Sequence, residues 1–398
     1  MAPLRRRVIR SARPQTLTTL ASALTVAVMA IAPAAINGDA ASASSAAPAT
    51  SATLVSPASA AAVSPQKAGM AALMESYNPG DGEIGSGWWQ AAIALSTLET
   101  YQQTTGDRSY SFAIAQVFAD HQSRMFVNRF DDDTGWWGLA WLQAYELTGS
   151  RQYLLAAETD ASFLHRHWDS TCGGGIYWVT RPHDYYKNAI TNELFLELAA
   201  GLHNAIPGDT TYLSWAQAEW AWFENSGMIN GSNLVNDGLN ADCENNHGTT
   251  WTYNQGVILA GLSQLYTATK NPGLLAEAKR IARAAISHLT VGGVLREPCE
   301  GSQCGNDVRG DPESFKGVFV QDLKVLAVTA RTRQFNKFFR KQAQSIEAHD
   351  TSRSGQSGMF WAGPMADDDS YSQASAEAAL VAVLKLPHGS DSRKAQTP

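Results

Sequence analysis

Three consecutive carboxylates, Asp131, Asp132 and Asp133, stand in the segment RFDDDTGWWG at 129–138. Neighbouring like charges raise the pKa of one carboxyl and keep another ionised. Glycoside hydrolysis divides its roles in this way, because one carboxylic acid protonates the leaving oxygen while one carboxylate attacks the anomeric carbon. A retaining mechanism needs two carboxyls about 5 Å apart, and side chains of adjacent residues reach that separation. The same residue types are also typical of a calcium loop or of an acidic helix N-terminus.

Four further segments combine aromatic side chains with amides or lysine: GWWQ (87–90), YYKNAITNE (185–193), TYNQG (252–256) and FKGVF (315–319). Aromatic faces stack on sugar rings, and amides bind sugar hydroxyls. For each residue alone, core packing or helix capping is the alternative. The candidate substrate-binding residues are Trp88, Trp136, Trp137, Asn188, Asn192, Tyr253, Gln255 and Lys316.

The segments that carry these residues alternate with helical patterns along the chain. Apolar residues recur at helical spacing in about twelve segments, and alternating strand patterns stay short. The expected starts are Gln66, Trp88, Ser109, Trp136, Arg151, Ala189, Thr211, Thr252, Gly273, Gly317, Arg333 and Tyr371.

Short turns recur between helices in TTGDRSY (104–110), LTGSRQY (147–153) and PGDTTY (207–212), whereas long loops precede the other helices. Short turns force antiparallel neighbours, so the recurrence predicts a repeat of helical hairpins. Six hairpins close into a double ring whose long loops open at one end, where a site is expected. An open solenoid is the alternative.

Five motifs together resemble glycoside hydrolase family 76, the endo-α-1,6-mannanases, over about Gly87 to Leu380. The resemblance implies an all-α (α/α)6 barrel, a toroid of six helical hairpins. It also implies retaining cleavage of α-1,6-mannosidic bonds. The motifs are DDDTGWWGLAW (131–141), CGGGIYW (172–178), YKNAITNELF (186–195), TYNQGV (252–257) and FKGVFV (315–320).

The catalytic pair that the family implies is the Asp-Asp before x-G-W-W, which falls on Asp132 as nucleophile and Asp133 as acid/base. Asp131 departs from the family pattern, because an aromatic residue is common at that place. A mannan transglycosylase of the same family is the second enzyme hypothesis. A non-catalytic mannan-binding protein is the alternative from another class.

The N-terminus predicts export. A basic segment with Arg5, Arg6, Arg7 and Arg10 precedes an apolar run and small residues, as in a signal peptide. An uncleaved membrane anchor is the alternative. The predicted organisation is a signal peptide at 1–37, a disordered Ala/Ser/Pro-rich linker at 38–65, a catalytic domain at 66–386 and a flexible tail at 387–398.

Charge and cysteine content indicate which ligands and cross-links to expect. The net charge of −7 and the absence of a Lys/Arg stripe in the body disfavour nucleic acid. Cys299 and Cys304 are close enough in sequence for a disulfide, with Cys172 and Cys243 as the remaining pair, although other connectivities stay open. Neither CxxC nor HExxH occurs, so no metal or cofactor is expected. We expect a secreted monomer that binds α-1,6-linked mannan or mannooligosaccharides, without stable membrane association after signal cleavage.

Overall fold

The computed structural model describes residues 63–180, 186–300, 310–366 and 368–388. The chain divides into two units, Met1–Ala60 and Ala61–Pro398, and all described residues belong to the second. The predicted signal peptide, nearly all of the linker and most of the tail therefore lie outside the described residues.

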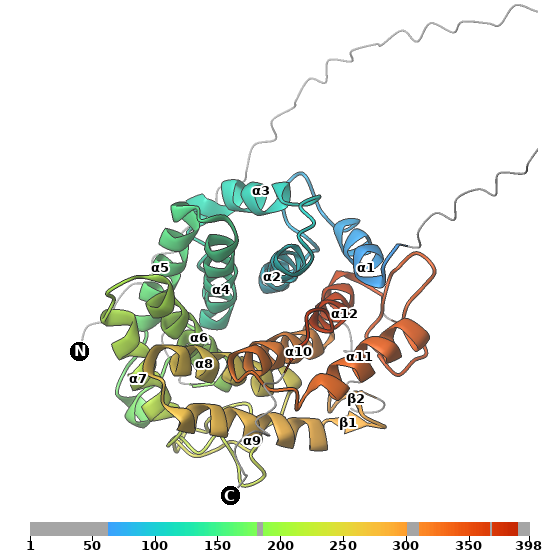
Figure 1. Ribbon diagram of the computed structural model, residues 1–398. Helices are drawn as coiled ribbons and strands as arrows, with labels where there is room; N and C mark the ends of the chain where they lie inside the picture. Colours follow the sequence, from blue (N-terminus) through green and yellow to red (C-terminus); the bar gives the residue numbers. More distant parts are fainter. Residues whose placement is uncertain (1–62, 181–185, 301–309, 367, 389–398) are drawn as a thin grey trace, which may run out of the picture. The chain divides into compact units, whose positions relative to one another are not determined.

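Six helices of the second unit form a closed inner ring, in which each helix packs against the next (Figure 1). Because the last of them also packs against the first, the ring is a barrel and not an open solenoid. The predicted all-α (α/α)6 architecture is confirmed. The inner helices are α2 (Trp88–Thr105), α4 (Asp131–Thr148), α6 (Ala189–Ala205), α8 (Thr252–Thr269), α10 (Asp311–Thr329) and α12 (Ser370–Ala382).

An outer layer of helices surrounds this ring. Helix α5 packs against α4, α7 against α6, and α9 against α8, while α1 and α11 both pack against α12. The outer helices are α1 (Pro65–Met74), α3 (Phe112–His121), α5 (Arg151–His165), α7 (Thr211–Phe223), α9 (Pro272–His288) and α11 (Asn336–His349). The smaller elements are the 3-10 turns η1 (Gln122–Arg124) and η2 (Thr171–Gly173) and the antiparallel pair β1 (Thr290–Val291) and β2 (Val294–Leu295).

Left-handed residues end several inner helices and make the short turns possible. Gly106 ends α2 with φ 81°, and Gly149 ends α4 with φ 72°, a conformation that glycine adopts at no steric cost. Lys270 takes the corresponding place after α8 with φ 58°. The long loops that precede the inner helices therefore gather at the other end of the barrel.

Two inner helices begin earlier than the apolar pattern predicts. Helix α4 begins at Asp131 and not at Trp136, and α10 begins at Asp311 and not at Gly317. Carboxylates in a first helical turn interact favourably with the helix dipole, and Pro312 suits a first turn because its missing N–H has no partner there. Polar first turns do not show in an apolar periodicity, so the carboxylate triplet belongs to the helix and not to the preceding loop.

The first and last helices of the described chain complete the barrel together. Gln66 of α1 donates to the backbone oxygen of Leu380 in α12 at 3.1 Å. Gln373 of α12 donates in return to the backbone oxygen of Gly69 at 2.9 Å. A Cβ at Gly69 would clash with Glu377, so the two helices approach each other closely.

One disulfide joins two of the long loops. Cys172 and Cys243 are bonded with an S–S distance of 2.04 Å, which confirms that predicted pair. Cys304 lies outside the described residues, so its pairing with Cys299 stays a prediction. Among the described residues, no helix has the length and apolar content needed to cross a membrane.

Buried carboxyls predict a protein that is more stable at mildly acidic pH than above neutrality. Burial raises the pKa of Glu297 to about 8, of Asp322 to about 8 and of Asp350 to about 7. Their unfolded values lie near 4, so this stabilisation is complete below about pH 4 and is lost as the pH rises through the folded values. Asp107 and Asp169, with pKa lowered to about 2, act oppositely and lose their contribution only in stronger acid.

We expect the free energy of unfolding to fall by on the order of 2 kcal/mol between about pH 5 and about pH 8. Urea midpoints at both pH values measure it. The matched control is Glu297→Gln, which is neutral at every pH and should reduce the dependence, while Asp322 and Asp350 keep their shares. An equal or higher midpoint at the alkaline pH would contradict the prediction.

Candidate active site

The first turn of α4 presents two half-buried carboxylates at the end of the barrel where the long loops gather. Asp132 accepts a hydrogen bond from Trp178 Nε1 at 2.9 Å through Oδ2 and one from the Asp133 backbone N–H at 3.0 Å through Oδ1. Asp133 accepts through Oδ2 from Asn128 Nδ2 at 2.5 Å. The two carboxylates thus have different environments, with two N–H donors on the first and one amide on the second.

Burial raises the pKa of both carboxyls. For Asp132 the charge of Asp133 raises it further, against the hydrogen bond from Trp178, which lowers it. The pKa of Asp133 rises to about 6, because burial and the charge of Asp311 outweigh the hydrogen bond from Asn128. Such a pair holds a proton at mildly acidic pH, as an acid and a nucleophile acting together require.

The third carboxylate of the triplet, Asp131, has a structural environment. Its side chain is 0% exposed, and His167 Nδ1 lies 2.9 Å from Oδ2 and 3.1 Å from Oδ1. The Asp131 backbone N–H donates to the oxygen of Trp178 at 2.9 Å. Asp131 therefore joins α4 to the turn that follows α5 and to the loop that carries Trp178.

Two of the predicted substrate-binding residues belong to the aromatic group beside the carboxylates. Trp136 stacks on Trp89 with ring centroids 5.8 Å apart. Tyr253 stacks on Phe315 at 3.9 Å. Burial raises its pKa, and the charges of Asp237 and Asp132 raise it further. Tyr253 is half-buried, and the influence of the Asp132 charge on its pKa indicates that it lies near the pair.

The other two predicted tryptophans lie in the packing behind the site. Trp137 is 0% exposed and stacks on Trp141 at 5.6 Å. Trp88 is partly buried and packs against Trp137 at 4.9 Å and His121 at 5.2 Å.

The predicted amides are buried and hydrogen-bonded to backbone. Asn192 binds both the N–H and the oxygen of Ile176, at 2.7 and 3.0 Å. Gln255 binds the N–H and the oxygen of Val235, each at 2.8 Å. Asn188 caps α6 through the backbone N–H of Thr191 at 3.4 Å. These amides attach the long loops to the inner helices.

The predicted lysine is buried as well. Lys316 Nζ donates to Glu300 Oε1 and to the backbone oxygen of Met359, both at 2.5 Å. It also lies 4.9 Å from the ring centroid of Trp361. Its described contacts are thus to protein groups.

A second buried lysine holds the loop that carries Trp178. Lys187 Nζ donates to Asp169 Oδ1 at 2.8 Å and to the backbone oxygens of Thr171 at 2.7 Å, Gly174 at 2.6 Å and Gly175 at 3.0 Å. Gly174 and Gly175 have positive φ, and a Cβ at either would clash with Trp222. The glycine run is therefore required by the close packing of this loop.

Several residues at the site are absent from the sequence prediction. Trp178 lies within the motif CGGGIYW but carries no spacing signal toward the carboxylates. Asp311 lies in the polar first turn of α10, where it accepts from Trp89 Nε1 at 3.2 Å and Gln90 Nε2 at 2.9 Å. Asn128 stands outside every motif, although it is only five residues before Asp133.

Comparison with known proteins agrees with this geometry. The family model "Glycosyl hydrolase family 76" matches residues 63–394. Mannan endo-1,6-alpha-mannosidase DFG5 of Candida albicans is 28% identical over 262 residues, which cover 59% of this chain and 57% of that protein. Mannan endo-1,6-alpha-mannosidase DCW1 of Saccharomyces cerevisiae is 29% identical over 262 residues, 60% of this chain and 58% of that protein. The matches thus span less than two thirds of these relatives.

Solved structures extend the likeness over the whole barrel. The GH76A alpha-1,6-mannanase from Salegentibacter sp. HEL1_6 is 26% identical with a TM-score of 0.72, over 80% of this chain and 98% of that chain. An inactive variant of that enzyme, in which two aspartates with consecutive numbers are substituted, has been solved with alpha-1,6-mannotetrose, at 25% identity, TM-score 0.73 and the same coverage. The match of the family model over most of the sequence and the barrel with its paired aspartates lead to one conclusion: this chain belongs to glycosyl hydrolase family 76.

Proposed function

We propose that the protein is a secreted, retaining endo-α-1,6-mannanase that cleaves mannan with Asp132 and Asp133. The observation that carries the proposal is the pair of carboxylates in the first turn of α4, with different hydrogen-bond partners. The names of the relatives support the substrate. The double substitution that inactivates the Salegentibacter enzyme supports the importance of a consecutive aspartate pair.

The hydrogen bonds of the two aspartates suggest which one is the nucleophile and which one is the acid/base. Hydrogen bonds to an ionised carboxylate stabilise it, and Asp132 accepts two N–H donors. We therefore place the negative charge on Asp132 and the proton on Asp133. Asp132 attacks the anomeric carbon as Asp133 donates its proton to the glycosidic oxygen, so the C–O bond breaks and a mannosyl ester forms. Asp133 then takes a proton from water, whose oxygen attacks the anomeric carbon and releases Asp132.

The aromatic group beside the pair is the proposed mannan-binding surface. Trp136 and Tyr253 would bind sugar, with Trp89 and Phe315 holding their rings in place. Trp88, Trp137, Asn188, Asn192, Gln255 and Lys316, which were predicted from the sequence to bind substrate, are proposed to act by positioning the loops and helices of the site.

The proposal is tested on unbranched α-1,6-mannan. Release of reducing ends shows hydrolysis, and proton NMR of the first-formed product shows its anomeric configuration. We expect an α-configured new reducing end. A β-configured end would mean inversion and would overturn the assignment of the two aspartates. Products longer than the substrate would indicate the transglycosylase, and saturable binding without any turnover the non-catalytic protein.

Removal of the Trp178 N–H should weaken the nucleophile. In Trp178→Phe, the loss of a hydrogen bond to an ionised group, about 1.5–3 kcal/mol, disfavours the carboxylate form of Asp132. We expect kcat to fall about 10- to 100-fold and the acid limb of the pH profile to move to higher pH, with KM changed less. The control is Trp168→Phe, whose ring packs against Trp222. An unchanged pH profile with unchanged kcat would refute the role of Trp178.

Export and solution state belong to the same proposal. The basic and apolar N-terminal segment supports secretion, and the substrate is a polysaccharide met outside the cell. We propose a monomer without stable membrane association after signal cleavage. N-terminal sequencing and light scattering of the secreted protein test both points.

A further inference from the structure

A cavity lies along the axis of the barrel, among the inner helices. Its volume is about 630 Å³, within the range of small-molecule sites. It extends from Trp136 in α4 to Thr104 near the end of α2 and Lys385 after α12. Neither Asp132 nor Asp133 lines it, so the cavity is separate from the site described above, with which it shares only the side chain of Trp136.

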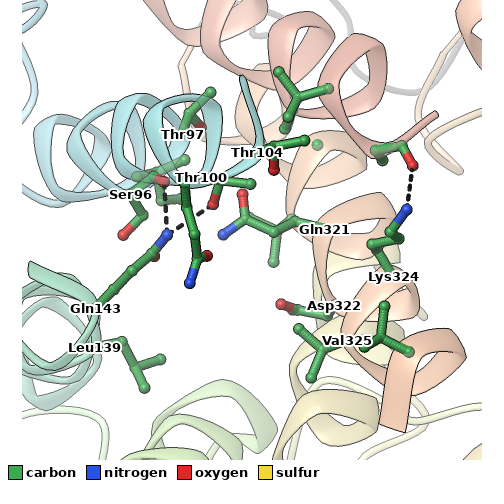
Figure 2. Close-up of a pocket in the computed structure, with 18 of the residues that line it drawn as sticks. Ser96, Thr97, Thr100, Thr104, Leu139, Gln143, Gln321, Asp322, Lys324 and Val325 are labelled. Atoms are coloured by element: carbon green, nitrogen blue, oxygen red, sulfur yellow. Dashed lines mark hydrogen bonds between the residues drawn. The ribbon is translucent and has the colours of Figure 1, made fainter. Parts of the chain in front are cut away.

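Both polar and apolar side chains line this cavity (Figure 2). Gln143 of α4 directs its amide nitrogen toward α2, to the Ser96 oxygen at 3.2 Å and Thr100 Oγ1 at 2.8 Å. Its carbonyl oxygen is then left to accept a hydrogen bond. Leu139, on the same helix as Gln143, and Val325 of α10 supply apolar wall.

One buried carboxylate in the lining has an unused oxygen. Asp322 is 8% exposed and points into the cavity in Figure 2. Its Oδ2 has no hydrogen-bond partner among the described residues, and neither has Oγ1 of Thr97, which is 1% exposed and also lines the cavity. Buried polar atoms of native proteins are nearly always paired, so an unpartnered pair of them in a cavity points to a ligand.

The carboxylates around Asp322 have no described counter-ion. Burial raises the pKa of Glu197, as do the charges of Asp322 and Glu146, which places these three lining groups close to one another. The pKa of Glu193, on the same helix as Glu197, is also raised by burial and by the charge of Asp322.

The lining contains one ammonium group inside the barrel, and it is already used. Lys324 Nζ donates to the backbone oxygens of Ala382 at 3.0 Å, Leu384 at 2.7 Å and Lys385 at 3.2 Å. Lys385 itself is exposed at the mouth of the cavity. The lining thus offers carboxylates and amide oxygens to a donor, and apolar wall to hydrocarbon.

We propose that the axial cavity is a binding site for an aliphatic ammonium compound of the polyamine type. An ammonium group has three N–H donors and no acceptor, which matches Asp322, Glu197 and the Gln143 carbonyl oxygen. Its methylene chain suits Leu139 and Val325, because aliphatic amines bury their carbon chains against apolar surface. The site does not depend on the proposed mannanase activity.

The experiment is isothermal titration of the full secreted chain with spermidine at constant ionic strength. We expect saturable binding of one ligand per cavity that tightens from about pH 6 to about pH 8, as the carboxyls give up their protons. Asp322→Asn keeps the shape and removes the charge, and should weaken binding at least about tenfold. Glu224→Gln, an exposed carboxylate on the outer layer, is the matched control and should bind as the wild type does.

Three results of this titration would overturn the proposal. These outcomes are absence of saturable heat, equal weakening by the control variant, and unchanged binding by Asp322→Asn. Saturable binding of Ca²⁺ or of free mannose that depends on Asp322 and excludes spermidine would assign the cavity to a metal ion or a neutral sugar instead. If Asp322→Asn does not fold, Glu197→Gln takes its place with the same expected loss.

Discussion

Asp132→Asn should abolish the first chemical step whatever the leaving group, with a loss in turnover on the order of 10⁴-fold or more. The amide has the size of the carboxylate but cannot form the ester with the anomeric carbon. Because Asp132 is hydrogen-bonded by Trp178 and by the Asp133 backbone N–H, the variant should keep its fold. Initial rates on mannan and on an activated aryl α-mannoside measure the loss.

Asp133→Asn should behave differently in kind. Turnover of mannan should fall about 10²- to 10⁴-fold, the usual contribution of a general acid–base group. An activated aryl mannoside needs no proton for its leaving group, so its first step should lose much less. Azide should then partly rescue the second step and give a mannosyl azide. Equal losses on both substrates, without rescue by azide, would exchange or remove the proposed roles.

The neighbouring carboxylate provides the matched control for this pair. Asp131→Asn keeps an acceptor for His167 and the backbone link to Trp178, and it removes only a buried charge. We expect it to keep activity within about tenfold, with a stability loss of about 1.5–3 kcal/mol. A loss as large as that of Asp132→Asn would mean that the triplet acts as one unit.

Lys187→Met should lower stability and catalysis together. The side chain is 1% exposed and its ammonium group has four oxygen partners on the glycine-rich loop. The Asp169 side chain is 44% exposed, so water can replace its partner, but the backbone oxygens stay unpaired, at a cost of about 1–3 kcal/mol. Urea unfolding measures the loss of stability. Since the same loop presents Trp178 to Asp132, we expect kcat to fall as in Trp178→Phe.

The control for this variant is the same substitution at a lysine of the outer layer. Lys279→Met, on the outer helix α9, should leave both the urea midpoint and kcat nearly unchanged. The effect of Lys187→Met on kcat should persist in the cold, where the variant is fully folded. A variant that is destabilised yet fully active at low temperature would show that the loop position does not depend on the lysine.

The barrel was predictable because its signals are local and repeated. Gly106 and Gly149 mark turns that force antiparallel helices, and the apolar spacing marks the helices between them. The starts of α4 and α10 were missed because the first turns of these helices carry the carboxylates of the site and few apolar residues. Their first turns are polar and acidic and interact favourably with the helix dipole, so apolar spacing begins only at Trp136 and Gly317, five and six residues later.

The site was predictable only where its residues share one segment. Asp132 and Asp133 are adjacent in the sequence, so their proximity needs no fold. Residue type alone could not separate the surroundings of two aromatic residues: Trp136 and Trp137 are neighbours in sequence and both buried, yet on a helix they point in different directions and stack on different rings. Asp311 is brought to Asp133 by tertiary structure alone, for which the sequence has no local signal, whereas Asn128 is only five residues away but belongs to no motif.

The packing of α12 against both α1 and α2 has a consequence for biosynthesis. The ring closes only when residues near Leu380, close to the end of the described chain, meet Gln66 near its beginning. A growing chain can build neighbouring hairpins in succession, but the apolar faces of α10 and α2 stay uncovered until the last helix has emerged. Such long-range closure is slow compared with local helix formation. The interval before closure leaves the chain open to translocation and to capture by chaperones, and a chain that ends before α12 has no surface to seal the gap.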